Sequence, residues 1–61
     1  MKVTVRFPNR NTREYSFEEL NVGDKNVLTV GTEIDVTGRK PKHMIKNIIV
    51  GRDGSVEIEV Y

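Results

Sequence analysis

The chain has 61 residues, which is room for a single domain spanning 1–61, and it contains no cysteine that could form a disulfide. Ten basic and nine acidic residues leave a net charge of +1, which argues against a strongly basic, non-specific nucleic-acid binder and against an acidic tail. One histidine is too few for a tetrahedral zinc site, so we expect no metal or other cofactor. The sequence shows neither a signal sequence nor an apolar run long enough to span a membrane. We therefore expect a cytoplasmic domain without membrane contact.

Valine, isoleucine and threonine dominate the composition and alanine is absent, which favours β-strands over helices. Alternating polarity predicts the first two strands at residues 2–7 and 12–17. We expect a three-residue turn at 9–11 between them, because that register sets Val5 opposite Tyr15 on an apolar face.

Ser16 and Glu19 have the spacing of a capping box, in which each residue hydrogen-bonds to the backbone of the other. The sequence therefore predicts one short helical turn near residues 17–20. The polar and glycine residues at 21–26 end it and indicate an irregular crossing loop.

Two further short strands are expected at residues 27–30 and 33–37, joined by Gly31 and Thr32. Their inward-facing side chains would be Leu28, Val30, Ile34 and Val36. A basic loop at 38–42 then leads into the longest apolar segment, residues 44–50, and the last strand is expected at 55–61.

The turn before the last strand predicts a defined register. If residues 52–54 form a type I turn with Gly54 in the left-handed conformation, Ile48 lies opposite Ile58 and valines 50 and 56 pair. That register leaves Ile45 and Ile49 on the outer face. Three explanations stay open: the 17–20 turn covers them, a bulge near residues 46–47 turns them inward, or they form an exposed apolar patch.

Short strands separated by turns every eight to twelve residues predict an all-β fold, a small antiparallel barrel of five or six strands. Residues 28–36, Leu-Thr-Val-Gly-Thr-Glu-Ile-Asp-Val, followed by the basic loop, a strand, a tight turn and a last strand, resemble an SH3-like barrel of the KOW or Tudor type. The resemblance covers the C-terminal half of the chain and implies the SH3-like strand order, with an OB-like order as the alternative.

No arrangement of residues indicates catalysis, and we expect no enzymatic activity. His43 is the only histidine and has no serine near it in sequence, so a nucleophile with its base is not expected. Glu57 and Glu59 alternate with apolar residues and face solvent, where Lys2 and Arg6 of the first strand can pair with them.

The strongest functional signal is a cluster of basic residues without an acidic member, here called the basic segment (residues 39–46). Its candidate binding residues are Arg39, Lys40, Lys42, His43 and Lys46. Such a cluster can contact phosphates, so we expect a binding module for an acidic partner, with nucleic acid as the candidate. Arginines 10, 13 and 52 lie either near this segment or at the opposite end.

The alternative function is a protein-interaction or assembly module, in which an exposed apolar strand face binds a protein partner or forms a homodimer. Its candidate surface comprises Ile45, Ile49 and Tyr61. Tyr61 is also the one aromatic residue expected outside the core, and so the one candidate for stacking on a nucleic-acid base.

Overall fold

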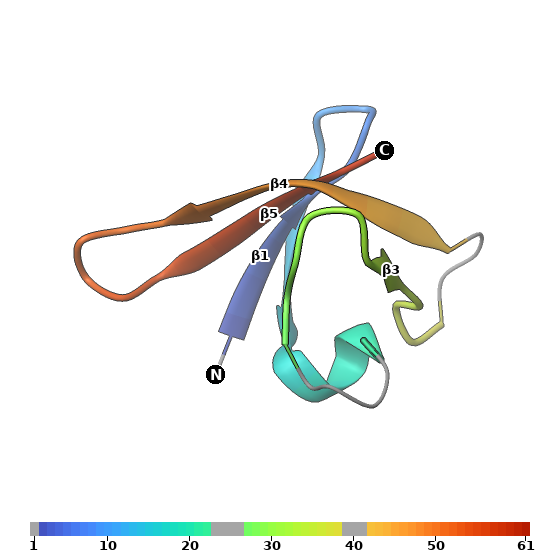
Figure 1. Cartoon of the computed structure of the whole chain (residues 1–61), viewed down its shortest axis with the longest axis horizontal. Helices are drawn as coiled ribbons and strands as arrows, with labels where there is room; N and C mark the ends of the chain where they lie inside the picture. Colours follow the sequence, from blue (N-terminus) through green and yellow to red (C-terminus); the bar gives the residue numbers. More distant parts are fainter. Residues whose placement is uncertain (1, 23–26, 39–41) are drawn as a thin grey trace.

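The computed structural model describes residues 2–22, 27–38 and 42–61, and within these ranges the chain is all-β (Figure 1). Its strands and its single turn of 3-10 helix are β1 (Lys2–Arg6), β2 (Thr12–Ser16), η1 (Phe17–Leu20), β3 (Glu33–Ile34), β4 (His43–Val50) and β5 (Val56–Val60). The described strands form one curled sheet in the order β2-β1-β5-β4-β3, a half-barrel. The predicted all-β fold is confirmed at this level.

The centre of the sheet differs from the predicted antiparallel barrel, because β1 and β5 run parallel. Val3 lies beside Val56 and Val5 beside Ile58, while the other strand pairs are antiparallel. The sheet is therefore mixed. Because β1 and β5 run in the same direction, their C-terminal ends lie at one edge of the molecule. The antiparallel strand β4 begins at the same edge (Figure 1). The first hairpin turn and the start of β4 consequently meet at that edge.

The first hairpin turns one residue earlier than predicted. Its turn consists of Pro8, Asn9 and Arg10, with the Arg10 N–H donating to the Phe7 carbonyl at 2.9 Å and the Phe7 N–H donating to the Asn11 carbonyl at 2.9 Å. Proline is favoured at the first central position of a type I turn, and this preference decides where the chain reverses.

As a result, Val3 and not Val5 lies opposite Tyr15, and Val5 lies opposite Arg13. The predicted register is therefore wrong. Each residue of β1 faces a partner two residues away from the expected one, and a shift of two keeps each side chain on its original face. This is why Tyr15 still packs against the core.

The last hairpin has the register predicted from its turn. Val50 lies opposite Val56 and Ile48 opposite Ile58. Gly51 closes the turn, with its N–H donating to the Ser55 carbonyl at 2.8 Å, and Gly54 takes the left-handed conformation with φ +84°. A side chain at Gly54 would be strained, which explains why this turn can be read from the sequence.

A β-bulge in β4 changes the orientation of the residues that precede it. Asn47 lies opposite Glu59, but Ile45 lies opposite Val60, so Lys46 is the extra residue. An extra residue reverses the alternation of faces beyond it. Ile45 is therefore turned inward and is fully buried. The expectation from the hairpin register alone, that Ile45 faces outward, is wrong, and the bulge explanation is correct for this residue.

The same bulge leaves Ile49 on the outer face, because Ile49 lies between the bulge and the hairpin turn. Its side chain is 46% exposed, so neither the bulge nor the 17–20 turn covers it. Of the two isoleucines that the sequence left outside, only this one stays there.

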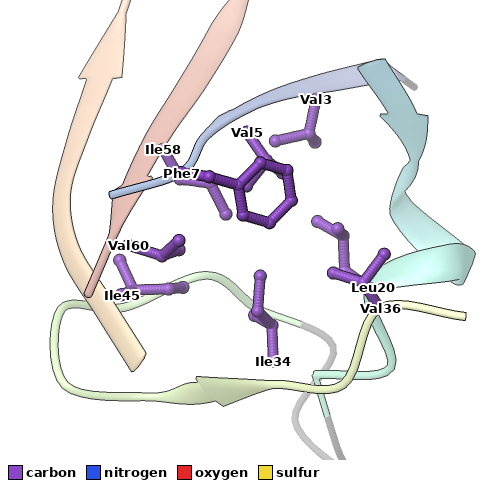
Figure 2. Packing of buried hydrophobic residues seen from close by; sticks show 9 residues of the cluster. All are labelled: Val3, Val5, Phe7, Leu20, Ile34, Val36, Ile45, Ile58 and Val60. Atoms are coloured by element: carbon purple, nitrogen blue, oxygen red, sulfur yellow. The ribbon is translucent and has the colours of Figure 1, made fainter. Parts of the chain in front are cut away.

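The core lies inside the curl of the sheet, with β1, β5 and β4 on one side and the segment that contains η1 and β3 on the other (Figure 2). Its buried side chains are Val3, Val5, Phe7, Leu20, Ile34, Val36, Ile45, Ile58 and Val60. Val30 is the exception among the predicted inward residues, since it is 64% exposed. It occupies a turn in which the Thr32 N–H donates to the Thr29 carbonyl at 3.1 Å and Gly31 has φ +90°. Residues 27–30 consequently do not form the expected strand.

The 3-10 turn η1 closes one end of the half-barrel and confirms the predicted helical turn. Leu20 is fully buried. The Ser16 N–H donates a hydrogen bond to Glu19 Oε1 at 2.8 Å, as expected for the glutamate of a capping box. Asn21, left-handed with φ 50°, donates from Nδ2 to the Asp35 carbonyl at 2.6 Å. This link ties η1 to the segment that follows β3 and holds the turn against the core.

Candidate anion-binding site

The described part of the basic segment lies at the start of β4. Lys42 and Lys46 are exposed and His43 is half-buried. Arg39 and Lys40, the other two candidates, lie outside the described residues. The site is therefore built from Lys46, the lysine of this segment that lines a hollow, and from what surrounds it.

His43 joins the start of β4 to the end of β5. Its Nδ1 lies 2.8 Å from the Tyr61 carbonyl oxygen, and its ring contacts the Phe7 ring edge-on, with centroids 5.2 Å apart. The imidazole thus contacts the core residue Phe7, and one of its nitrogens lies against the backbone of Tyr61. Through these contacts His43 helps to join β4 to β5.

Lys46, the bulged residue of β4, lies beside the residue that follows β5. Its Nζ is 5.6 Å from the centre of the Tyr61 ring, within the range of a cation–π contact. Tyr61 itself is 64% exposed. The bulge therefore brings together one candidate from the basic segment and the candidate stacking residue.

A shallow hollow of about 310 Å³, here called the basic hollow, lies next to Lys46 at the edge where β1 and β5 end. It is lined by Arg6, Phe7, Pro8, Arg10, Lys46, Glu59 and Val60. Arg6 comes from β1, Arg10 from the first turn and Lys46 from β4. Three cationic residues from these segments consequently line one concave surface.

The sequence prediction included Lys46 but not the two arginines. Arg10 could have been placed only by knowing that β1 and β5 are parallel, which brings the first turn to the start of β4. Arg52 lies in the turn at the far end of the β4–β5 hairpin, six residues along the chain from Lys46 and beyond the end of β4. Arginines 10 and 52 therefore lie at opposite ends of the hairpin.

Arg10 has an unusual backbone for its residue type. Its φ of 72° is left-handed, a conformation that costs a residue with a Cβ about 1–2 kcal/mol and that glycine or asparagine adopts more easily. Residues in such strained conformations are frequent at functional sites, where the function depends on the position of the side chain. Here the strained residue carries one of the three cations of the basic hollow.

The charges around the basic hollow are not all free to bind a ligand. Arg6 Nη2 lies 3.0 Å from Glu57 Oε2, an ion pair across β1 and β5 that agrees with the predicted structural role of Glu57. Glu59 is a lining residue, and Asn47 Nδ2 donates to its Oε1 at 3.4 Å. Three cations and one carboxylate give the lining a local charge of +2. Arg10 and Lys46 are the cations best placed to meet an anion.

The three predicted interaction residues do not form one surface. Ile45 is buried, while Ile49 and Tyr61 are exposed at separate places. The Tyr61 N–H donates to the Met44 carbonyl at 3.0 Å, which sets it five residues, or about 16 Å of strand, from Ile49. A single apolar patch made of these residues is therefore excluded.

Within residues 2–22, 27–38 and 42–61, no cluster of three or more histidine, cysteine or acidic side chains could hold a metal ion. The described chain also contains no helix of the length and hydrophobicity that a membrane span needs. Comparison with protein-family models, with curated proteins and with solved structures found no match to this chain.

Proposed function

We propose that the chain is a small, non-enzymatic binding module that holds an acidic partner at the basic hollow. The observation that carries this proposal is the convergence of Arg6, Arg10 and Lys46 from three separate segments on one concave surface. The strained backbone of Arg10 supports it, because a glycine would form the same turn at lower cost but would bring no charge.

Nucleic acid is the acidic partner best suited to a first test. Lysine and arginine side chains that neutralise phosphates release counterions, so the affinity falls steeply with salt. The chain has a net charge of only +1, so the attraction is local to the hollow and the binding should be strongly salt-dependent and modest in affinity. The basic loop of the SH3-like resemblance, residues 38–42, leads directly into β4 and adds to the same argument.

Binding can be measured by fluorescence anisotropy with a labelled oligonucleotide over a series of salt concentrations. We expect Arg10→Gln and Lys46→Gln to weaken binding and to reduce the slope of log K against log salt by about 0.7–0.9 for each phosphate that is no longer neutralised. Arg52→Gln is the matched control, because it removes the same charge from the far end of the hairpin. Its effect should be small.

Two results would contradict the proposal. One is the absence of measurable binding at low salt both to oligonucleotides and to poly-glutamate. The other is an equal loss of affinity in all three variants, which would show that only the total charge matters and that the basic hollow is not a site.

Arg10→Gly separates the contribution of this residue to binding from its contribution to folding. The substitution relieves the left-handed strain, so the domain should be as stable as the wild type or more stable by up to about 1 kcal/mol. Binding should nevertheless weaken as much as in Arg10→Gln. A stable variant that binds as tightly as the wild type would exclude Arg10 from the site.

A second candidate function, assembly through the outer half of β4, is supported by exposed apolar residues. Ile49 is 46% and Val50 67% exposed, and within the described residues no strand pairs with this part of β4 on the side away from β5. The Asn47 Oδ1 accepts the Ile48 N–H at 3.0 Å, however, which occupies one donor that an added strand would need. Sedimentation at high concentration tests this function, since a monomer mass would exclude a homodimer.

A further inference from the structure

We infer that the partner of the basic hollow is single-stranded nucleic acid, bound through one unpaired nucleotide whose base stacks on Tyr61. This inference rests on the proposed function and names its ligand. It combines the size of the hollow, the fixed position of Tyr61 beside Lys46, and the carboxylate of Glu59 among the cations.

The volume of the basic hollow limits what can enter it. At about 310 Å³ it lies at the lower end of the ~300–1,000 Å³ found for small-molecule sites. It has room for one nucleotide-sized group and is too small for the groove surface of a duplex. A duplex would contact only the rim of the basic hollow.

Tyr61 is held in a position to stack. Its N–H donates to the Met44 carbonyl and its carbonyl contacts His43 Nδ1, so the backbone is fixed on both sides. The side chain is 64% exposed, and its ring contacts Lys46, which lines the hollow. A phosphate bound at Lys46 therefore brings the neighbouring base to the tyrosine, an arrangement typical of single-strand binders.

Glu59 favours a ligand that carries hydrogen-bond donors beside its phosphate and disfavours one that carries only negative charge. A carboxylate among the lining residues repels phosphate, sulfate or carboxylate groups packed closely together. The edges of unpaired bases carry amino groups that can donate hydrogen bonds to the carboxylate of a glutamate. A polyphosphate offers neither an aromatic face for Tyr61 nor hydrogen-bond donors for Glu59, and poly-glutamate offers no aromatic face.

The experiment compares two oligonucleotides of equal length and equal phosphate count. One is a single strand of mixed sequence, and the other carries abasic sites throughout its central part. We expect the wild type to bind the base-bearing strand about five- to 150-fold more tightly, the factor that corresponds to one stacked base. The same strand annealed into a blunt duplex should bind more weakly than the single strand.

Substitutions of Tyr61 then assign that preference to the ring. Tyr61→Leu should lose the preference for the base-bearing strand and keep the affinity for the abasic one, while Tyr61→Phe, which keeps the ring, should retain the preference. The side chain is exposed, so both variants should unfold at the wild-type temperature in circular dichroism. That measurement shows that any change in binding is local.

Each failure has a distinct meaning. Equal binding of the two strands by the wild type, with both weakened by Lys46→Gln, would overturn the stacking inference and leave the anion site standing. Tighter binding of the duplex, or of poly-glutamate, would overturn it as well. Absence of binding to every one of these ligands at low salt would overturn the proposed function itself.

Discussion

The inward position of Ile45 can be tested against Ile49 on the same strand. Ile45 is fully buried, and truncating a buried isoleucine to alanine costs about 2–5 kcal/mol, since it removes apolar packing and leaves a cavity. Ile49 is 46% exposed, so Ile49→Ala loses about half of the ~1.5–3 kcal/mol of full burial and leaves no cavity. Both substitutions replace isoleucine by alanine in a strand and so lose a similar β-propensity. The difference between their changes in the free energy of unfolding therefore reports the difference in burial.

Equilibrium unfolding in urea, followed by far-ultraviolet circular dichroism, measures both costs. A domain of this length has a total stability of about 3–9 kcal/mol, so Ile45→Ala brings it close to unfolding. Ile45→Val, expected to cost about 0.5–1.5 kcal/mol, keeps the measurement possible if the alanine variant does not fold. Equal costs at the two positions, or a greater cost at Ile49, would refute the bulge at Lys46.

Three further predictions concern the turns and the surface of the sheet. Gly54→Ala should destabilise the domain by about 1–2 kcal/mol, because residue 54 has φ +84°, and an unchanged urea midpoint would contradict this. A double-mutant cycle on Arg6 and Glu57 should give a coupling of about 0.2–1 kcal/mol that decreases with salt; a coupling that does not respond to salt would argue against an exposed ion pair. Hydrogen bonds from Ser55 lower the pKa of Asp53, so this carboxylate stabilises the fold above about pH 4 and the effect disappears as the pH falls through the lowered value. The difference in melting temperature between the wild type and Asp53→Asn should accordingly be larger at pH 7 than at pH 2.5, and a difference independent of pH would contradict it.

The last hairpin and the first hairpin show how far turn chemistry can be read from a sequence. At the last hairpin, Gly54 occupies the left-handed position of the turn, which a glycine adopts without strain, so the register follows from its position. At the first hairpin, the left-handed position is occupied by Arg10, which carries no such signal. The proline at position 8 was the better indicator, and the turn begins there.

The candidate site was predicted only in part, for a similar reason. Lys46 belongs to a visible run of basic residues, whereas Arg6 and Arg10 are isolated cations in a different part of the chain. Nothing local places Arg10 near Lys46. Their proximity depends on the parallel pairing of β1 and β5, two strands that lie far apart in the sequence.

The sequence by itself determined the elements that depend on neighbouring residues. Alternating apolar residues predicted β1, β2, β4 and β5, the serine–glutamate spacing predicted η1, and the left-handed Gly54 predicted one register, whereas the strand expected at 27–30 does not form. These signals are local because backbone conformation and the alternation of faces are set within a few residues.

Only the tertiary structure decided the parallel centre of the sheet, the burial of Ile45 and the assembly of the basic hollow. Strand order depends on which distant apolar faces cover each other best, and the alternation pattern is the same for parallel and antiparallel neighbours. A single extra residue, Lys46, reverses the faces before it, and the energy that favours the bulge comes from burying Ile45 in the assembled core.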